Sequence, residues 1–419
     1  MEAPPLVQRL EFLKSRERFI PIRLPALCDR MLADGRLSAE ERQQLDVLFR
    51  MVAARFHFEF HEVFTELEEA YDPFDPDRDT LPSGEVADRG DARRELAERF
   101  ERLLLDANYV EMPANQVIAC AEYPSQRRLC VRANLSDYAE LRVFYRGIRQ
   151  TTREVPSWLR PWRTATESRH VFSRVALLVR LAKDPDGPVY LKLFKNVVAE
   201  DLEMLLPYVR IQMRWRDHLK VGSSVAGGVA TAAWKVLTAA ILSPVLLALV
   251  IGGFAGAAFR GVMSFLSSRT KYLQTLSSSL YFQNLANNSS VIGHLVDVAE
   301  AEECKELLLA YFLLYVERDR DFTQPQLDRR VEQWLRTEYG IEADFEIRDA
   351  IEKLCDKQLL VRRPGADVLK VFDLPTTLRK LDEVWDGYFE YNGASRAADR
   401  VADSHSRIHA RHARPAPRA

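Results

Sequence analysis

Apolar residues recur at helical spacing along the first part of the chain. One stripe comprises Leu45, Leu48, Phe49, Val52, Phe56, Phe60, Val63, Phe64 and Leu67. The Asp-Pro pairs after Tyr71 end this helix, because a proline disfavours helical backbone in the residue before it. A second stripe predicts a helix over 91–106. Residues 1–112 are therefore interpreted as a helical N-terminal region.

Residues 113–207 follow a two-residue period instead. Leu141, Val143 and Tyr145 alternate with their neighbours, and two further apolar runs cover 171–181 and 189–194. The segment between these runs, Asp-Pro-Asp-Gly-Pro, is a strong turn signal. Together with 127–132, these runs predict a small, mostly antiparallel sheet of about four strands.

A long stretch without acidic residues follows. From His218 to Val296 the chain has no Asp or Glu, and the 24 residues from Val236 to Phe259 carry no charge. A helix of that length spans ~36 Å, more than the ~30 Å hydrocarbon core of a bilayer. The fold class predicted from this pattern is an α+β membrane protein.

Two topologies are consistent with this stretch. One is a single span over 236–259, and the other is a transmembrane helical hairpin over 221–265 that turns at Ser243-Pro244. Similar numbers of basic residues on both flanks favour the hairpin, whereas Lys235 inside its first limb opposes it. The basic juxtamembrane segment 208–220 supplies the lipid-headgroup candidates Arg210, Arg214, Arg216 and Lys220.

The chain then returns to helical patterns. Long helices are predicted within 266–317, over 270–288 and 291–316. Thr323 and Asp344 are predicted to cap helices over 324–339 and 345–358, and strand residues flank Pro364-Gly365. This order predicts a winged-helix-like domain over 318–391. Residues 392–419 form a basic tail without apolar periodicity, which is expected to be disordered.

Composition limits the classes of function. The net charge is −2, and the predicted helix over 345–358 has a net charge of −1, so we expect no nucleic-acid partner. Five cysteines without a CxxC pair indicate reduced thiols in a cytosol-facing protein. The N-terminus has no secretory-signal pattern. No phosphate-loop, dinucleotide, nucleophile-elbow or HExxH motif occurs, so no cofactor is predicted and an enzyme is disfavoured.

Two groups of polar residues are candidates for a site. His57 and His61 are four apart on a predicted helix and could share a metal ion, but the sequence HFEFH favours helix packing. Gln283, Asn284, Asn287 and Asn288 form an amide cluster just beyond the uncharged stretch. They could bind a headgroup or polar ligand, although capping of helix ends explains them as well.

Several short stretches carry a resemblance to a known family. They are Arg18–Ile22, His57–His61, Tyr71–Pro76, Tyr145–Gly147, Leu191–Lys195, Leu202–Pro207, Tyr281–Asn288, Glu302–Glu306 and Leu309–Leu314. Over roughly residues 10–390 the chain resembles the uncharacterised membrane proteins grouped as domain of unknown function 3754, which include transmembrane protein 143. The resemblance implies an integral protein of the bacterial inner membrane and supplies no catalytic residues.

Three hypotheses for the function follow. The favoured one is an integral membrane protein that serves as a scaffold or binding protein, with cytoplasmic domains and with membrane lipid and a protein partner or second copy as partners. The alternatives are an enzyme acting on a lipid or lipid-linked substrate, and an oligomeric transporter or pore component.

Overall fold

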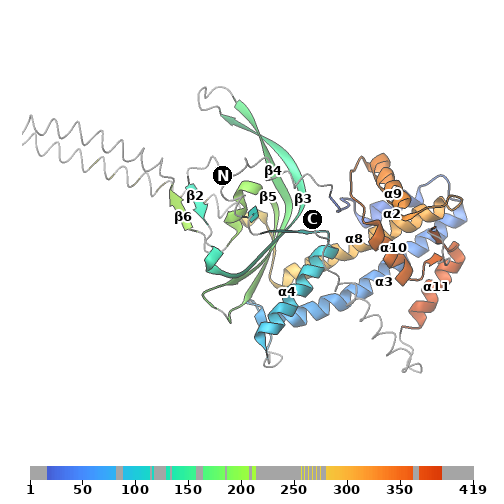
Figure 1. The fold of residues 1–419 in the computed structure, drawn as a ribbon, viewed down its shortest axis with the longest axis horizontal. Helices are drawn as coiled ribbons and strands as arrows, with labels where there is room; N and C mark the ends of the chain where they lie inside the picture. Colours follow the sequence, from blue (N-terminus) through green and yellow to red (C-terminus); the bar gives the residue numbers. More distant parts are fainter. Residues whose placement is uncertain are drawn as a thin grey trace, which may run out of the picture. The chain divides into compact units, whose positions relative to one another are not determined.

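The computed structural model describes most of the chain outside the uncharged stretch and the two ends. The described residues are 17–81, 88–113, 116–117, 129–132, 135–156, 164–184, 186–206, 210–213, isolated positions from 256 to 274, 280–361 and 368–388. They divide into two compact units (Figure 1). We call the described part of Glu111–Asn287 the sheet unit, and those of Lys14–Val110 and Asn288–Ala419 together the helical unit.

The sheet unit is built on a five-stranded sheet with the order β1-β3-β4-β5-β7. The pairings of β3 with β4, β4 with β5 and β5 with β7 are antiparallel. The strands are β1 (Val110–Met112), β3 (Tyr138–Pro156), β4 (Thr164–Leu181), β5 (Val189–Val198) and β7 (Asn284–Asn287). Tyr145, Val175 and Phe194 are buried in one apolar cluster, which also includes Leu202 and Leu205 from the 3-10 helix η4 (Ala199–Leu205). The alternating pattern of the sequence therefore places this core against the sheet.

Three short segments differ from the prediction. The strand predicted at 127–132 is β2 (Leu129–Arg132), but it pairs with β6 (Arg210–Met213) in a separate two-stranded sheet. Part of the predicted juxtamembrane segment is thus a strand. Similarly, the helix predicted over 270–288 ends in β7, because Asn284–Asn287 pair with β5. In each case a partner strand that is distant in sequence determines the local structure.

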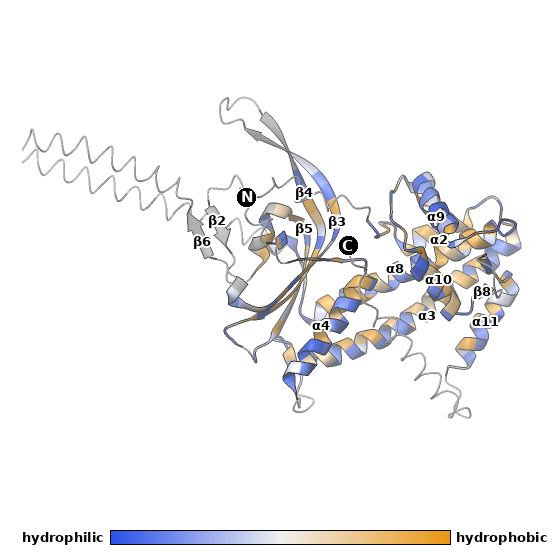
Figure 2. Cartoon of the chain, in the orientation of Figure 1, coloured by the Kyte–Doolittle hydropathy of each residue, from blue (hydrophilic) through white to orange (hydrophobic). Residues whose placement is uncertain are grey.

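The helical unit is arranged around α8 (Ser289–Val316), in which every residue from Cys304 to Tyr315 is buried. Four helices contact α8: α3 (Ala39–Tyr71), α4 (Arg89–Asp106), α9 (Gln324–Tyr339) and α10 (Ile347–Asp356). Apolar and hydrophilic positions are interleaved along α3, as a helix covered on one side requires (Figure 2). The remaining elements are α2 (Leu24–Leu32), η2 (Asp72–Phe74), β8 (Leu360–Val361), β9 (Lys370–Val371) and α11 (Leu374–Asp386).

The structure corrects the prediction of a membrane protein. Within the described ranges, no helix combines the length and the apolar composition that a membrane crossing requires. The two longest helices there, α3 and α8, carry many charged residues. Of the predicted transmembrane hairpin, residues 221–255 and most of 256–265 lie outside the described residues.

Candidate functional site

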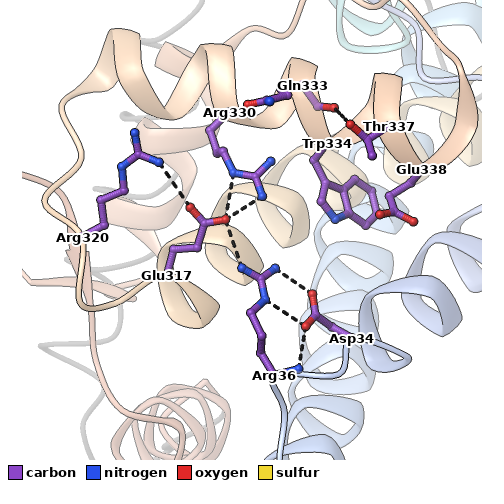
Figure 3. A pocket seen from close by; sticks show the side chains of 9 residues that line it. All are labelled: Asp34, Arg36, Glu317, Arg320, Arg330, Gln333, Trp334, Thr337 and Glu338. Carbon is purple, nitrogen blue, oxygen red and sulfur yellow. Dashed lines mark hydrogen bonds and ion pairs between the residues drawn. The ribbon is translucent and has the colours of Figure 1, made fainter.

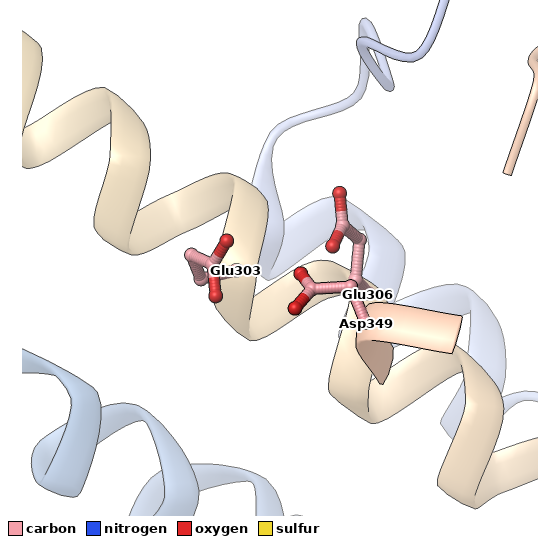
Figure 4. Close-up of side chains that lie close together, drawn as sticks. All are labelled: Glu303, Glu306 and Asp349. Atoms are coloured by element: carbon pink, nitrogen blue, oxygen red, sulfur yellow. The ribbon is translucent and has the colours of Figure 1, made fainter. Parts of the chain in front are cut away.

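A dense group of ionisable side chains lies between α8 and α10. Glu303 and Glu306 are one turn apart on α8, and Asp349 is on α10 (Figure 4). Carboxylate oxygens from these three residues lie within 4.8 Å of one another. Such a set of oxygens has the chemistry to hold a hard divalent cation.

A lysine ammonium occupies the centre of this cluster. Lys353 Nζ lies 2.5 Å from Glu303 Oε2, 2.8 Å from Glu306 Oε2 and 2.5 Å from Asp349 Oδ2. The Lys353 side chain is only 3% exposed. A buried charge requires such partners, so we interpret the carboxylate cluster as the counter-charge of Lys353.

The cluster holds more acids than one lysine can neutralise. Burial and the neighbouring carboxylates raise the pKa of Asp106, at the end of α4, to about 7, although Lys353 opposes the shift. Burial likewise raises the pKa of Glu303 well above its ordinary value. Burial would lower the pKa of Lys353, but Glu303, Glu306 and Asp349 raise it further and keep the ammonium charged. The arrangement can therefore hold a proton on a carboxylate close to neutral pH.

An open pocket of about 470 Å³ lies beside α9 (Figure 3). Figure 3 shows three arginines of its lining directed at Glu317: Arg330 at 2.7 Å, Arg36 at 3.2 Å and Arg320 at 3.8 Å. Asp34, paired with Arg36, and Glu338 balance the remaining positive charge of the lining. The lining of the pocket thus contains three arginines and three carboxylates. Because these charges are balanced, the lining favours neither an anionic nor a cationic ligand.

The two candidate histidines, His57 and His61, each contact another side chain. His57 is 73% exposed, and its Nδ1 lies 3.0 Å from Glu300 Oε2 on α8. His61 stacks on Phe64, with ring centroids 6.2 Å apart. The first contact joins α3 to α8, and the second lies within α3.

The predicted amide cluster is divided between the two units. Gln283 donates to the carbonyl of Asn196 at 3.2 Å, and Asn284 and Asn287 belong to β7. Asn288 precedes α8, is 3% exposed and donates to Asp77. Each of these amides thus has a place or a partner of its own, in the sheet unit for the first three and in the helical unit for Asn288. Of the predicted headgroup candidates, Arg210 lies in β6, and Arg214, Arg216 and Lys220 lie outside the described residues.

Sequence reasoning missed the Lys353 cluster. Asp349 and Lys353 are four residues apart on a helix, which is a local signal of an ion pair. Nothing in the sequence, however, indicates that Glu303 and Glu306, about fifty residues earlier, face the same lysine.

Three of the stretches that carry the resemblance lie on strands of the main sheet: Tyr145–Gly147 is in β3, Leu191–Lys195 is in β5, and Tyr281–Asn288 contains β7. Residues 138–290 match the family model described as a protein of unknown function, DUF3754. The DUF3754 match thus falls on the sheet unit and the first residues of α8. It confirms the resemblance to this family, whereas the narrower likeness to transmembrane protein 143 is not confirmed. No solved structure matches the chain.

Proposed function

We propose that this protein is a binding or scaffold protein whose helical unit docks a protein partner through an aromatic surface. The surface consists of Phe58 on α3, Trp385 on α11 and Tyr388 just after α11. The Phe58 ring meets the Trp385 ring edge-on at 5.9 Å and the Tyr388 ring at 4.8 Å. Trp385 is 43% and Tyr388 37% exposed. This aromatic surface is the observation that carries the proposal, because large aromatic side chains supply much of the energy at protein interfaces.

The chemistry around the aromatic surface favours a basic partner. The last turn of α11 presents Asp382, Glu383 and Asp386, all exposed, and no basic residue. Tyr388 donates to Glu62 Oε1 at 3.1 Å, which fixes its ring. We therefore expect a partner segment that offers an apolar side chain for the ring faces and Arg or Lys for the acidic rim.

The elements after α8 support protein binding over nucleic-acid binding. Phe322 forms a bridge with Leu369, and α9, α10, β8 and β9 then follow in the order of a winged helix. In such a domain α10 would enter a DNA groove. Lys353 of α10 and Lys357, which directly follows this helix, are unsuited to phosphate contacts, because they are buried against carboxylates of α8 and α3. Among the bases of α10, Arg348 is exposed.

Site-specific photo-cross-linking in cells that naturally make the protein tests this proposal. A photoreactive phenylalanine analogue replaces Tyr388, and the control carries it at Val47, which has a matched exposure of 38% on α3. We expect cross-links from position 388 to a basic, apolar segment of a partner protein, and several-fold fewer when Asp382 and Asp386 are both changed to Asn. Equal cross-linking from both positions, or cross-links to nucleic acid or to a second copy alone, would contradict the proposal.

A further inference from the structure

A row of like charges crosses the sheet unit. Arg174 of β4 lies directly opposite Arg146 of β3 on one side and Lys195 of β5 on the other. Residues that are directly opposite in antiparallel strands have Cβ atoms ~4.5–5.5 Å apart, and like charges in such pairs are destabilising. The strand register therefore places three cations side by side, an arrangement that favours a negative charge nearby.

Two of these three cations have no acidic partner in the described structure. The backbone of Lys195 belongs to the β4–β5 pairing, but its side chain makes no ion pair or hydrogen bond with any described residue. Arg174 donates from Nη1 to the carbonyl of Ser173 at 2.8 Å, and its Nε is buried without a hydrogen-bond partner. Elsewhere in the sheet arginines do meet acids, as Arg142 does with Glu111 at 2.8 Å.

The three central strands are strongly basic as a whole. β3, β4 and β5 together contain nine Arg and Lys residues against three Glu, a net charge of +6, in a chain whose net charge is −2. Charge segregation of this kind attracts anions to the sheet.

The backbone beside the row is held in an unusual conformation. Gly147 and Asn196, which follow Arg146 and Lys195, have φ values of 72° and 53°. Asn196 is clamped on both sides, because its Oδ1 accepts from Arg149 Nη2 at 2.7 Å and its carbonyl accepts from Gln283. A left-handed residue other than glycine costs free energy, and such positions are concentrated at binding sites.

We propose that Arg174 and Lys195, with Arg146 beside them, form a binding site for a phosphate group. A guanidinium offers a planar pair of N–H donors, and an ammonium offers a compact point charge. Two to three cations match the dianionic charge of a phosphate better than the single charge of a carboxylate. The group could belong to a free phosphate compound or to a lipid headgroup. This site goes beyond the proposed protein docking and lies in the other unit, so either can fail without the other.

Thermal unfolding of the full chain with inorganic phosphate tests the site, with chloride at equal ionic strength as the reference. Because a ligand that binds only the folded state raises the melting temperature, we expect a shift that increases with phosphate concentration. Arg174→Gln and Lys195→Gln should each weaken apparent binding at least tenfold. Arg180→Gln is the matched control, since it removes one arginine from the same strand but one that faces Glu140 at 3.8 Å.

Melting temperatures without phosphate show whether each variant folds. Because R174Q and K195Q each remove one of the neighbouring like charges, their melting temperatures should equal or exceed that of the natural protein. Flotation with phosphatidylcholine vesicles, with and without phosphatidic acid, distinguishes a lipid headgroup from a free phosphate compound as the ligand. Binding to inorganic phosphate, or to phosphatidic acid vesicles alone, with loss in R174Q and K195Q but not in R180Q, supports the site. Absence of binding to both probes, or equal losses in all three variants, would overturn it.

Discussion

Lys305 and Glu302, one turn apart on α8, form an ion pair with a distance of 2.6 Å between Nζ and Oε1. The two side chains are 3% and 2% exposed. Both also bind the N-terminal segment: Lys305 Nζ donates to the carbonyls of Ile20 and Ile22, at 2.7 and 3.1 Å, and Glu302 Oε2 accepts from the Ile20 amide at 3.2 Å. This pair therefore fixes residues 20–22 against the central helix and satisfies their backbone groups.

Removal of one member of this pair should be strongly destabilising. Lys305→Met leaves Glu302 buried without its counter-charge, for which we expect a loss of about 3–5 kcal/mol in the free energy of unfolding. The double variant Lys305→Met with Glu302→Gln should lose less than the sum of the single variants. Urea unfolding measures these values. Arg50→Met, in the exposed pair with Asp46, is the control and should cost less than about 1 kcal/mol. Similar losses in K305M and R50M would contradict the assigned role.

The carboxylate cluster should make stability depend on pH. The raised pKa of Asp106, about 7, means that the folded state binds more protons than the unfolded state between pH 4 and 7. The free energy of unfolding should therefore fall as the pH rises through this window. Glu303, whose pKa is also raised, contributes in the same direction, and Glu306, Asp349, Lys353 and Arg102 complete the group.

The variant Asp106→Asn isolates this effect. It should flatten the pH dependence between pH 5 and 8 and should be more stable than the natural protein at pH 8, because the repulsion among ionised carboxylates is reduced. Urea unfolding at a series of pH values measures the slope. Glu98→Gln, on the exposed side of the same helix, should leave the slope unchanged. An unchanged slope in D106N would show that Asp106 does not hold a proton in the folded state.

The start of α3 depends on a capping box. The Glu41 amide donates to Ser38 Oγ at 3.1 Å, and the Ser38 amide donates to Glu41 Oε2 at 2.9 Å. The bond from the Ser38 amide, together with those from the side chains of Tyr315 and Arg318, lowers the pKa of Glu41 to about 2. Ser38→Ala should cost about 1 kcal/mol, and Ser38→Gly only a few tenths. Equal losses for both variants in thermal or urea unfolding would argue against a capping role.

The end of α9 depends on glycine. Gly340 has φ +67° and provides the left-handed C-cap. Gly340→Ala should cost about 1 kcal/mol, since a Cβ disfavours this conformation. Gly35→Ala is the matched control: open space surrounds a Cβ there and its φ lies outside the left-handed region, so stability should be unchanged or slightly higher. A neutral G340A variant would contradict the expectation.

The sequence alone predicted those elements whose cause is local. The apolar stripe from Leu45 to Leu67 lies in α3, and Thr323 precedes α9, which covers the predicted range 324–339. The alternation around Val143 and the turn signal after Lys183 predicted β3, β4 and β5 of an antiparallel sheet. Helix periodicity, caps and turns act over a few residues, so a single sequence contains them.

Tertiary structure decided the rest. Asn284–Asn287 are a strand because they pair with β5, and Leu129–Arg132 pair with β6 and not with the main sheet. The uncharged run from Val236 to Phe259 predicted a membrane protein, which the helices of the described chain do not support. The cluster at Lys353 joins residues about fifty positions apart, and the row Arg146–Arg174–Lys195 depends on strand register. Hydropathy and charge specify what a segment can pair with, but only packing among distant segments selects the partner.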